Sequence, residues 1–302
     1  MDTLFPTKIK IKPKGDKIVF CRPHGGLNDM LVQIEKCYRY AYTYNRSLYI
    51  DTSRSGFLDD FGRYFVAPVN VYFGTLDFLN PPFDCYPKCL SDNIAAYEVL
   101  YDECLTLLHA KTNTKITFDF NKNYKEQILV HEQAGGGAKS IFAIGRLRLK
   151  DNIKIHIRTI IDLLGEYDAI HVRNSDYKTD YKKFFNEMNE KLGGKIVLCT
   201  DSYECQAYAK EFWGDRLHIV TNVPDTKGKP LHENKKLDRF QTNVNALTDL
   251  FVLACSKSLY LTNIEPNKNH PWTVEKGWIS GFASLAKSLH ERKDLIDRLL
   301  YA

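Results

Sequence analysis

Residues 168–177 place a histidine, an arginine and an aspartate close together, directly after a short apolar run. Residues 168–172 are predicted to form a buried strand, and the chain beyond it stays polar until Tyr177. A guanidinium is permanently charged and its planar fork of donors matches phosphate oxygens, so Arg173 at a strand end could hold a phosphate group. The alternative is an ordinary surface ion pair between Arg173 and Asp176, without any ligand.

Two further acids lie where a nucleotide could reach them. Asp201 ends a second expected strand, residues 194–201, and could accept a hydrogen bond from a ribose hydroxyl or a base. The alternative is local, because either Asp201 or Ser202 could cap the next helix. Asp249 lies in an apolar helix, where a buried acid needs a partner. That partner is either a protein group or the base of a nucleotide.

Two turns could bind an anion through backbone N–H groups. Gly25 and Gly26 follow an expected strand and precede an expected helix, so a ligand could approach the backbone closely, although a tight strand-to-helix turn would use the same residues. Ser280 is expected to cap a helix whose first turn, at Gly281, is free of side-chain bulk. The N–H groups and the positive dipole end of that helix suit a diphosphate.

The first half of the chain contains the elements of a βαβ unit. Residues 17–22 are predicted to be a strand, an apolar stripe predicts a helix from Asn28 or Asp29 onward, and residues 47–51 return as a strand. Such a crossover makes the two strands parallel. The three glycines at 135–137 predict either a mobile loop over a ligand or a hinge between domains. Further strands are expected at 69–73 and 127–131.

The second half alternates strands and helices more regularly, which predicts a doubly wound parallel sheet. We therefore expect an α/β protein with two Rossmann-like domains, residues 1–150 and residues 151–302. The expected elements of the second half are helix 153–164, strand 168–172, helix 180–192, strand 194–201, helix 202–213, strand 217–220, helix 243–255, strand 259–262 and helix 280–290.

Several segments, in the right order, resemble motifs of the fucosyltransferase superfamily. Residues 171–177 (His-Val-Arg-Asn-Ser-Asp-Tyr) are similar to the family's His-x-Arg-x-x-Asp motif, with Asn174 where relatives have a second arginine. Residues 25–31 resemble its Gly-Gly-x-Gly-Asp segment, with Asn28 in place of the third glycine; asparagine tolerates a left-handed backbone, so this exchange is mild. The likeness spans residues 17–51 and 168–290, and its further segments are 200–202, 248–255 and 280–286.

The resemblance implies the GT-B architecture, in which two Rossmann-like domains face a cleft, and an inverting transfer of fucose or a related sugar from a nucleoside-diphosphate donor, GDP being favoured, to a glycan hydroxyl. Arg173 opposite the 280–290 helix would neutralise the leaving diphosphate without a metal ion, and the sequence has no Asp-x-Asp pair. The donor residues implied are His171, Arg173, Asp176, Asp201, Asp249, Ser280, Gly281 and Phe282; the phosphate or acceptor loop is His24, Gly25, Gly26 and Asn28.

A sugar transfer also benefits from a group that takes the proton of the acceptor hydroxyl. Some relatives carry a catalytic carboxylate shortly after the arginine motif, where Asp180 lies in this sequence. Asp180 could instead belong to the first turn of its helix. Asp29, from the opposite domain, and His24, beside the glycines, are the other candidates. Arg173 is expected to take part in catalysis by stabilising the leaving diphosphate.

Charge and composition allow an enzyme and are compatible with an anionic small substrate. With 42 basic and 37 acidic residues the net charge is +5, which is too mild and too evenly spread to predict a nucleic-acid partner. The first residues lack the apolar core of a signal peptide, and no apolar run of about 18 residues predicts a transmembrane helix. Several of the eight cysteines lie in apolar segments and are expected to be reduced. We therefore expect a cytoplasmic enzyme without a resident cofactor or metal. Because animal members of the superfamily it resembles are secretory, the resemblance implies a bacterial or viral type.

Two other classes of function fit the same pattern. One is a sugar-nucleotide epimerase or hydrolase of the same architecture, and the other is a non-catalytic carbohydrate-binding protein. Release of nucleoside diphosphate that depends on a glycan would identify a transferase, whereas interconversion of free nucleotide sugars would identify an epimerase. The donor sugar, the acceptor glycan and the oligomeric state stay open at this point.

Overall fold

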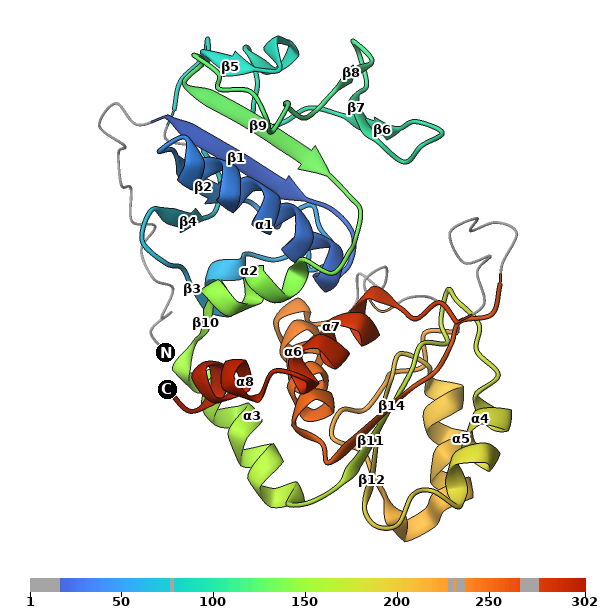
Figure 1. The fold of residues 1–302 in the computed structure, drawn as a ribbon. Helices are drawn as coiled ribbons and strands as arrows, with labels where there is room; N and C mark the ends of the chain where they lie inside the picture. Colours follow the sequence, from blue (N-terminus) through green and yellow to red (C-terminus); the bar gives the residue numbers. More distant parts are fainter. Residues whose placement is uncertain (1–16, 77–78, 228–230, 232–236, 267–276) are drawn as a thin grey trace, which may run out of the picture.

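Two parallel sheets form the centres of two stacked domains in the computed structural model (Figure 1). The structure describes residues 17–76, 79–227, 231, 237–266 and 277–302. Each sheet is built from strands that are joined by crossovers, as the alternation of apolar segments predicts. Among the described residues, no helix is long and apolar enough to cross a membrane.

The N-terminal sheet has five parallel strands in the order β4-β2-β1-β9-β5. The central strand, β1 (Ile18–Pro23), is buried at every position and pairs with β2 (Ser47–Ile50) on one side and β9 (Ile128–Gln133) on the other. β4 (Val71–Phe73) and β5 (Cys85–Tyr86) are the edge strands. β4 is shorter than the strand expected at residues 69–73.

The two faces of the N-terminal sheet are covered differently. α1 (Leu27–Thr43) begins just before the expected start and packs on one face through its apolar stripe. The other face is covered by residues of segment 79–116 outside β5, and no α-helix lies among them. That segment contains an antiparallel sheet of three short strands, β6 (Val99–Tyr101), β7 (Leu107–His109) and β8 (Thr114–Lys115).

The C-terminal sheet has four parallel strands in the order β13-β12-β11-β14. The expected strands at 168–172 and 259–262 correspond to β11 (Asp168–Val172) and β14 (Ser258–Leu261). β12 (Ile196–Thr200) ends one residue before Asp201, and β13 (Leu217–His218) is shorter than expected.

Helices cover both faces of the C-terminal sheet, which confirms the doubly wound arrangement there. Helix α6 packs on β11 and is flanked by α3 and α7, while α4 and α5 lie on the opposite face. A further helix, α8, follows α7, so the expected closing helix is not the last one. The bounds are α3 (Asp151–Leu164), α4 (Tyr181–Asn189), α5 (Tyr203–Trp213), α6 (Arg239–Cys255), α7 (Gly281–His290) and α8 (Lys293–Leu300).

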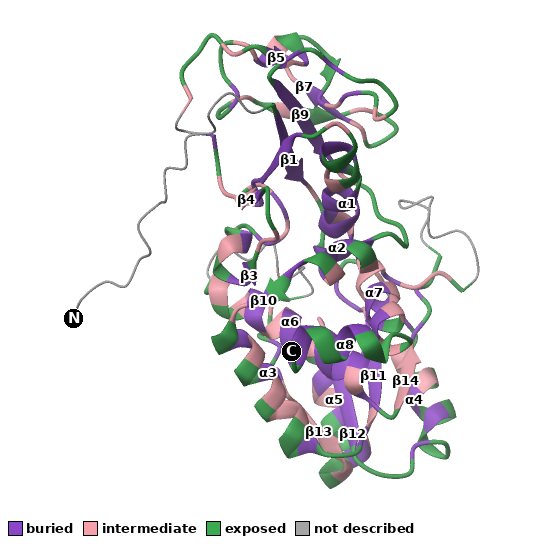
Figure 2. Ribbon diagram, turned by 60° about the vertical axis from the view of Figure 1, so that its left-hand side comes forward, coloured by how far each residue is buried: buried purple, intermediate pink, exposed green. Residues whose placement is uncertain are grey.

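A continuous hydrophobic core joins the two domains (Figure 2). Asn243 of α6 donates hydrogen bonds from its side-chain Nδ2 to the Phe57 carbonyl (2.9 Å) and to the Tyr64 hydroxyl (3.0 Å). These two hydrogen bonds and the shared apolar core connect the two domains. The connecting elements are α2 (Ser140–Arg146) and β10 (Arg148–Leu149), and β10 pairs with β3 (Phe65–Val66). The predicted domain boundary at residue 150 lies between β10 and α3.

Candidate active site

The carboxyl edge of the C-terminal sheet brings three of the predicted residues together. Arg173 follows β11, and its guanidinium lies 2.5 Å from the Asp176 carboxylate and also contacts the Asp201 carboxylate, which follows β12. The Arg173 side chain keeps 24% of its surface exposed. The carboxyl ends of neighbouring parallel strands meet at one edge, which explains why residues far apart in the sequence form this group. Arg173 is therefore ion-paired, yet it still reaches the surface.

Asp201 and Asn174 hold the loop that carries Arg173. The Asp201 carboxylate accepts hydrogen bonds from the Asn174 backbone N–H (2.7 Å) and the Ser175 hydroxyl (2.6 Å). Asn174 is buried; its side chain donates to the Ser202 hydroxyl (3.3 Å) and accepts from the Thr179 N–H (3.1 Å). Asn174 thus braces the loop. Ser202, rather than Asp201, is the N-cap of α5.

His171 links the sheet to α7. Its ring is buried and lies against the Phe282 ring, with 5.4 Å between the centroids. Burial lowers the pKa of His171 to about 4, so its imidazole is neutral near pH 7. A neutral ring packed on the first turn of α7 positions that helix N-terminus relative to β11.

The start of α7 meets the start of α1 from the other domain. Ser280 is the N-cap of α7, and its hydroxyl accepts from the Ala283 N–H. Gly281 lies so close to Asn28 that a methyl group on it would come within 3.0 Å of Asn28 Nδ2. In the described part of the chain, Asn28 Oδ1 is buried and has no hydrogen-bond partner. Two motifs that were predicted separately are therefore in contact.

The two glycines of the turn before α1 differ in backbone conformation and in the space around them. Gly25 has φ +85°, and a methyl group there would lie 2.7 Å from a carboxylate oxygen of Asp29. Gly26 is exposed, with open space around the position of a methyl group. The Asp29 carboxylate accepts from the Gly26 N–H at 3.3 Å, and burial raises the pKa of Asp29. Asp29 thus serves as a capping residue of α1.

The glycine segment 135–137 is attached to α1. Gln33 donates hydrogen bonds from its side-chain Nε2 to the carbonyls of Ala134 (2.9 Å) and Gly135 (2.5 Å). A methyl group on Gly136 would lie 2.5 Å from an oxygen of Asp29. These contacts hold the segment against the helix that starts at the domain junction.

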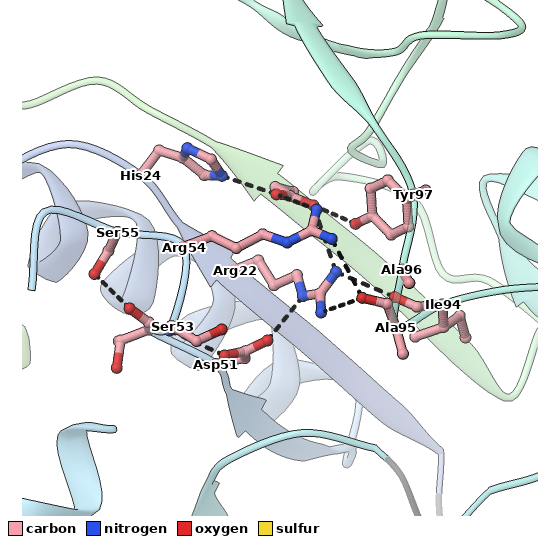
Figure 3. Close-up of polar contacts among 12 residues, drawn as sticks. Arg22, His24, Asp51, Ser53, Arg54, Ser55, Ile94, Ala95, Ala96 and Tyr97 are labelled. Atoms are coloured by element: carbon pink, nitrogen blue, oxygen red, sulfur yellow. Dashed lines mark hydrogen bonds and ion pairs between the residues drawn. The ribbon is translucent and has the colours of Figure 1, made fainter. Parts of the chain in front are cut away.

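The carboxyl edge of the N-terminal sheet carries a second charged group (Figure 3). Arg22, in β1, donates from Nε to Asp51 (2.9 Å) and from its terminal nitrogens to the carbonyls of Ile94 (3.1 Å) and Ala95 (3.0 Å). Glu132, in β9, lies 3.9 Å from the same guanidinium. Both Arg22 and Glu132 are buried.

Glu132 also has partners outside β1. His24 Nε2 lies 2.8 Å from Glu132 Oε1, Arg54 Nη1 lies 3.3 Å from the same oxygen, and the Tyr97 hydroxyl donates to the other oxygen. Burial opposes ionisation of Glu132, but the hydrogen bond from His24 and the charge of Arg22 outweigh it and lower its pKa. Of these residues only His24 was predicted from the sequence. The criterion that found Arg173, a polar residue at the end of a strand, would also have found Arg22, Asp51 and Glu132.

Two of the predicted acids have local partners. Asp180 is exposed and is the N-cap of α4, where its carboxylate accepts from the Lys183 N–H at 3.1 Å. Asp249 accepts from the Thr221 hydroxyl at 2.8 Å, and burial raises the pKa of Asp249 to about 7. Both arrangements match the local alternatives that the sequence analysis left open for these residues.

A cavity of about 440 Å³ lies between α1, α2 and α8 and contains none of the predicted site residues. Two of its arginines are already paired, Arg146 with Glu35 and Arg292 with Asp294. The described residues contain no group of three or more His, Cys, Asp or Glu side chains arranged to hold a metal ion.

Several solved structures of fucosyltransferases share the fold of this chain. No protein-family model matches the sequence, and a comparison with curated proteins gives no match. The fucosyltransferase NodZ from Bradyrhizobium has 16% sequence identity and a TM-score of 0.60, and the alignment covers 91% of this chain and 93% of NodZ. NodZ α-1,6-fucosyltransferase soaked with GDP-fucose gives a TM-score of 0.59 at 16% identity, over 91% of this chain and 92% of that one. NodZ co-crystallised with GDP gives a TM-score of 0.58 at 15% identity, and the alignment covers 91% of this chain and 92% of that one. The expected α/β fold of GT-B architecture is thereby confirmed.

Proposed function

We propose that the protein is a glycosyltransferase that moves fucose or a related sugar from a nucleoside-diphosphate donor, with GDP as the favoured nucleotide, to a hydroxyl of a glycan. The observation that carries this proposal is the contact between Gly281 at the start of α7 and Asn28 at the start of α1. It places two helix N-termini from the two domains at one junction, beside the edge that carries Arg173. Helix N-termini and a guanidinium are the groups that bind a diphosphate.

The donor diphosphate would bind at the first turn of α7. Ser280 satisfies the N–H of Ala283, which leaves the N–H groups of Gly281 and Phe282 as donors toward the junction. Arg173 would add a positive charge, although Asp176 and Asp201 neutralise part of it. Binding of the diphosphate would therefore require both the N-terminus of α7 and Arg173.

The GDP type of donor is supported by the NodZ structures, one co-crystallised with GDP and one soaked with GDP-fucose. In our proposal the nucleotide binds the C-terminal domain and the acceptor approaches from the N-terminal domain. We further propose that the anomeric carbon inverts, because one acceptor hydroxyl would displace the diphosphate directly.

The proposed transfer proceeds without a metal ion, because Arg173 and the α7 N-terminus would stabilise the negative charge that develops on the leaving diphosphate. We expect GDP release in the presence of a glycan acceptor to continue at an unchanged rate in excess EDTA. Complete loss of turnover in EDTA that Mn²⁺ or Mg²⁺ restores would contradict this part of the proposal.

A thermal-shift panel with GDP, UDP, CDP and ADP tests the donor site. A ligand that binds the folded state raises Tm by mass action, and we expect GDP to give the largest rise. The second step measures GDP release from GDP-fucose with and without a mixture of glycans. Release that depends on glycan supports a transferase, whereas release that does not would identify a hydrolase. No shift with any nucleotide would refute a nucleotide-sugar site.

A further inference from the structure

The carboxyl edge of the N-terminal sheet contains a polar group that a donor site does not explain. We call Arg22, His24, Arg54, Tyr97 and Glu132 the Glu132 cluster. The Glu132 side chain has no exposed surface, and the four other members contact it from β1, from the turn after β1 and from the loops after β2 and before β6. A buried carboxylate with this many donors is held in one position. His24 is therefore held by a fixed acceptor.

Glu132 determines which ring nitrogen of neutral His24 carries the proton. Glu132 accepts hydrogen bonds from the Tyr97 hydroxyl and from Arg54, and the Arg22 guanidinium lies 3.9 Å away, so the Glu132 oxygens act as acceptors. Its partner atom, His24 Nε2 at 2.8 Å, must therefore donate. The neutral imidazole then has its lone pair on Nδ1. Among the described residues no hydrogen bond to His24 Nδ1 occurs, and in Figure 3 the dashed contact of His24 leaves from the other ring nitrogen.

The backbone places His24 at the junction of the domains. Its N–H donates to the Gln133 carbonyl at 2.9 Å, which fixes it beside the end of β9. The next residues are the exposed Gly25 and Gly26, and Asn28 already touches Gly281 of α7. In Figure 1 the arrows of β1 and β9 point toward the C-terminal domain. His24 thus lies on the N-terminal side of the proposed donor site, with 12% of its side chain exposed.

We propose that His24 is the general base of the transfer and that Glu132 is the residue that positions it. This inference rests on the proposed function. The acceptor hydroxyl oxygen forms a bond to the anomeric carbon, while the bond from that carbon to the diphosphate oxygen breaks and its electron pair leaves with GDP. The hydroxyl proton moves to His24 Nδ1. The imidazolium that forms is stabilised by the Glu132 carboxylate on Nε2.

The two carboxylates that compete for this role have less suitable positions. Asp180 lies on the exposed start of α4 and caps that helix. Asp29 caps α1 through Gly26, and its oxygens are packed against Gly25 and Gly136. Each of these acids accepts from a backbone N–H, whereas His24 is held by a buried carboxylate that can stabilise its protonated form.

The decisive comparison is His24→Ala against wild type and against His156→Ala, which removes an exposed histidine from α3. We expect kcat for glycan-dependent GDP release from GDP-fucose to fall by about 10²- to 10⁴-fold in His24→Ala, as loss of a general base typically causes. GDP binding, measured by thermal shift, should stay unchanged. Added imidazole should restore part of the lost rate, because it can accept the proton in the vacated space; a structural role would give no such rescue.

The outcomes separate this inference from the proposed function. A wild-type protein that neither binds GDP nor releases it from GDP-fucose would refute the proposed function itself. A folded His24→Ala protein that transfers at the wild-type rate would refute the base role alone. Loss of GDP binding together with transfer in His24→Ala would also refute it, because His24 would then be a donor-binding residue.

Glu132→Gln tests the positioning role. Glutamine keeps the shape but not the charge, so we expect kcat to fall with GDP binding unchanged and without rescue by imidazole. Transfer at the wild-type rate in folded Glu132→Gln would refute the positioning role. If this variant does not fold, His24→Ala with its imidazole rescue still decides the identity of the base.

Discussion

The carboxyl edges of the two sheets carry the same type of group in different states of burial. At each edge an arginine is paired with two acids, Arg22 with Asp51 and Glu132, and Arg173 with Asp176 and Asp201. Arg22 keeps 3% of its side-chain surface exposed, whereas Arg173 keeps 24%. The difference arises because segment 94–97 covers the N-terminal edge and supplies carbonyl acceptors to Arg22.

This difference indicates separate tasks for the two edges. Arg22 donates its hydrogen bonds to groups of the protein and is buried, so it does not reach a ligand. His24 is partly exposed, so at this edge it is the side chain that could contact a substrate. At the C-terminal edge, Arg173 is held by its acids and is still accessible to an anion. A buried cation thus stabilises the fold, while a partly exposed one can bind a ligand.

The largest expected effect concerns stability at the N-terminal edge. Arg22→Met should lower the free energy of unfolding by about 3–5 kcal/mol, because removing one partner leaves buried carboxylates uncompensated. Arg173→Met should cost about 1 kcal/mol or less, since its pairs are partly solvated. Urea denaturation of both variants gives the comparison. Equal losses would contradict the distinction between the two edges.

The second prediction concerns activity at the C-terminal edge. Arg173→Ala should reduce glycan-dependent GDP release by about 10²-fold or more, as the loss of a preorganised charge contact typically does. Arg148→Ala, an exposed arginine of β10, is the matched control and should keep the wild-type rate. Near-normal transfer by folded Arg173→Ala would show that its ion pairs serve the loop alone.

The third prediction compares two acids that lie in different surroundings. Glu132 has a lowered pKa among cations, whereas burial raises the pKa of Asp249 to about 7, with Thr221 as its hydroxyl partner. An acid whose pKa is higher in the folded than in the unfolded state stabilises the fold at pH values below its unfolded pKa, which is near 4. This contribution to stability is lost as the pH rises through the folded pKa, about 7. Asp249→Asn should therefore raise stability by on the order of 2 kcal/mol at pH 8 and have little effect at pH 4.

Thermal unfolding at the two pH values checks the Asp249 prediction. A variant that is equally stabilised at pH 4 and pH 8 would exclude titration of Asp249 as the cause. A variant that folds normally but no longer shows a Tm rise with GDP would instead support contact between Asp249 and the nucleotide base.

The smallest expected effect is at the glycine turn of the N-terminal edge. Gly25→Ala should cost about 1–2 kcal/mol, because φ +85° disfavours an L side chain and the methyl group would meet Asp29. Gly26→Ala, next to it, has open space and should change stability by about 0.5 kcal/mol or less. Chemical denaturation of the pair gives the difference. Equal effects would mean that the turn is not held by Asp29.

Local sequence patterns predicted most of the elements but not the layer that covers one face of the N-terminal sheet. The apolar runs that became β1, β2, β11 and β12 were predicted within a residue or two, because a buried strand has a short and continuous apolar signal. The irregular segment that covers one face of the N-terminal sheet was not predicted. Its strands are two or three residues long, too short for a periodic pattern.

By itself, the sequence determined which polar side chains follow each strand, because strand direction and residue type are properties of one short segment. Arg173 and Asp176 could be paired from their spacing alone. Only the tertiary structure decided that Asp201 joins them, that Asn28 touches Gly281, and that His24 is held by Glu132. These contacts depend on strand order and on how the two domains stack, and both are set by the burial of a shared apolar core rather than by any single segment.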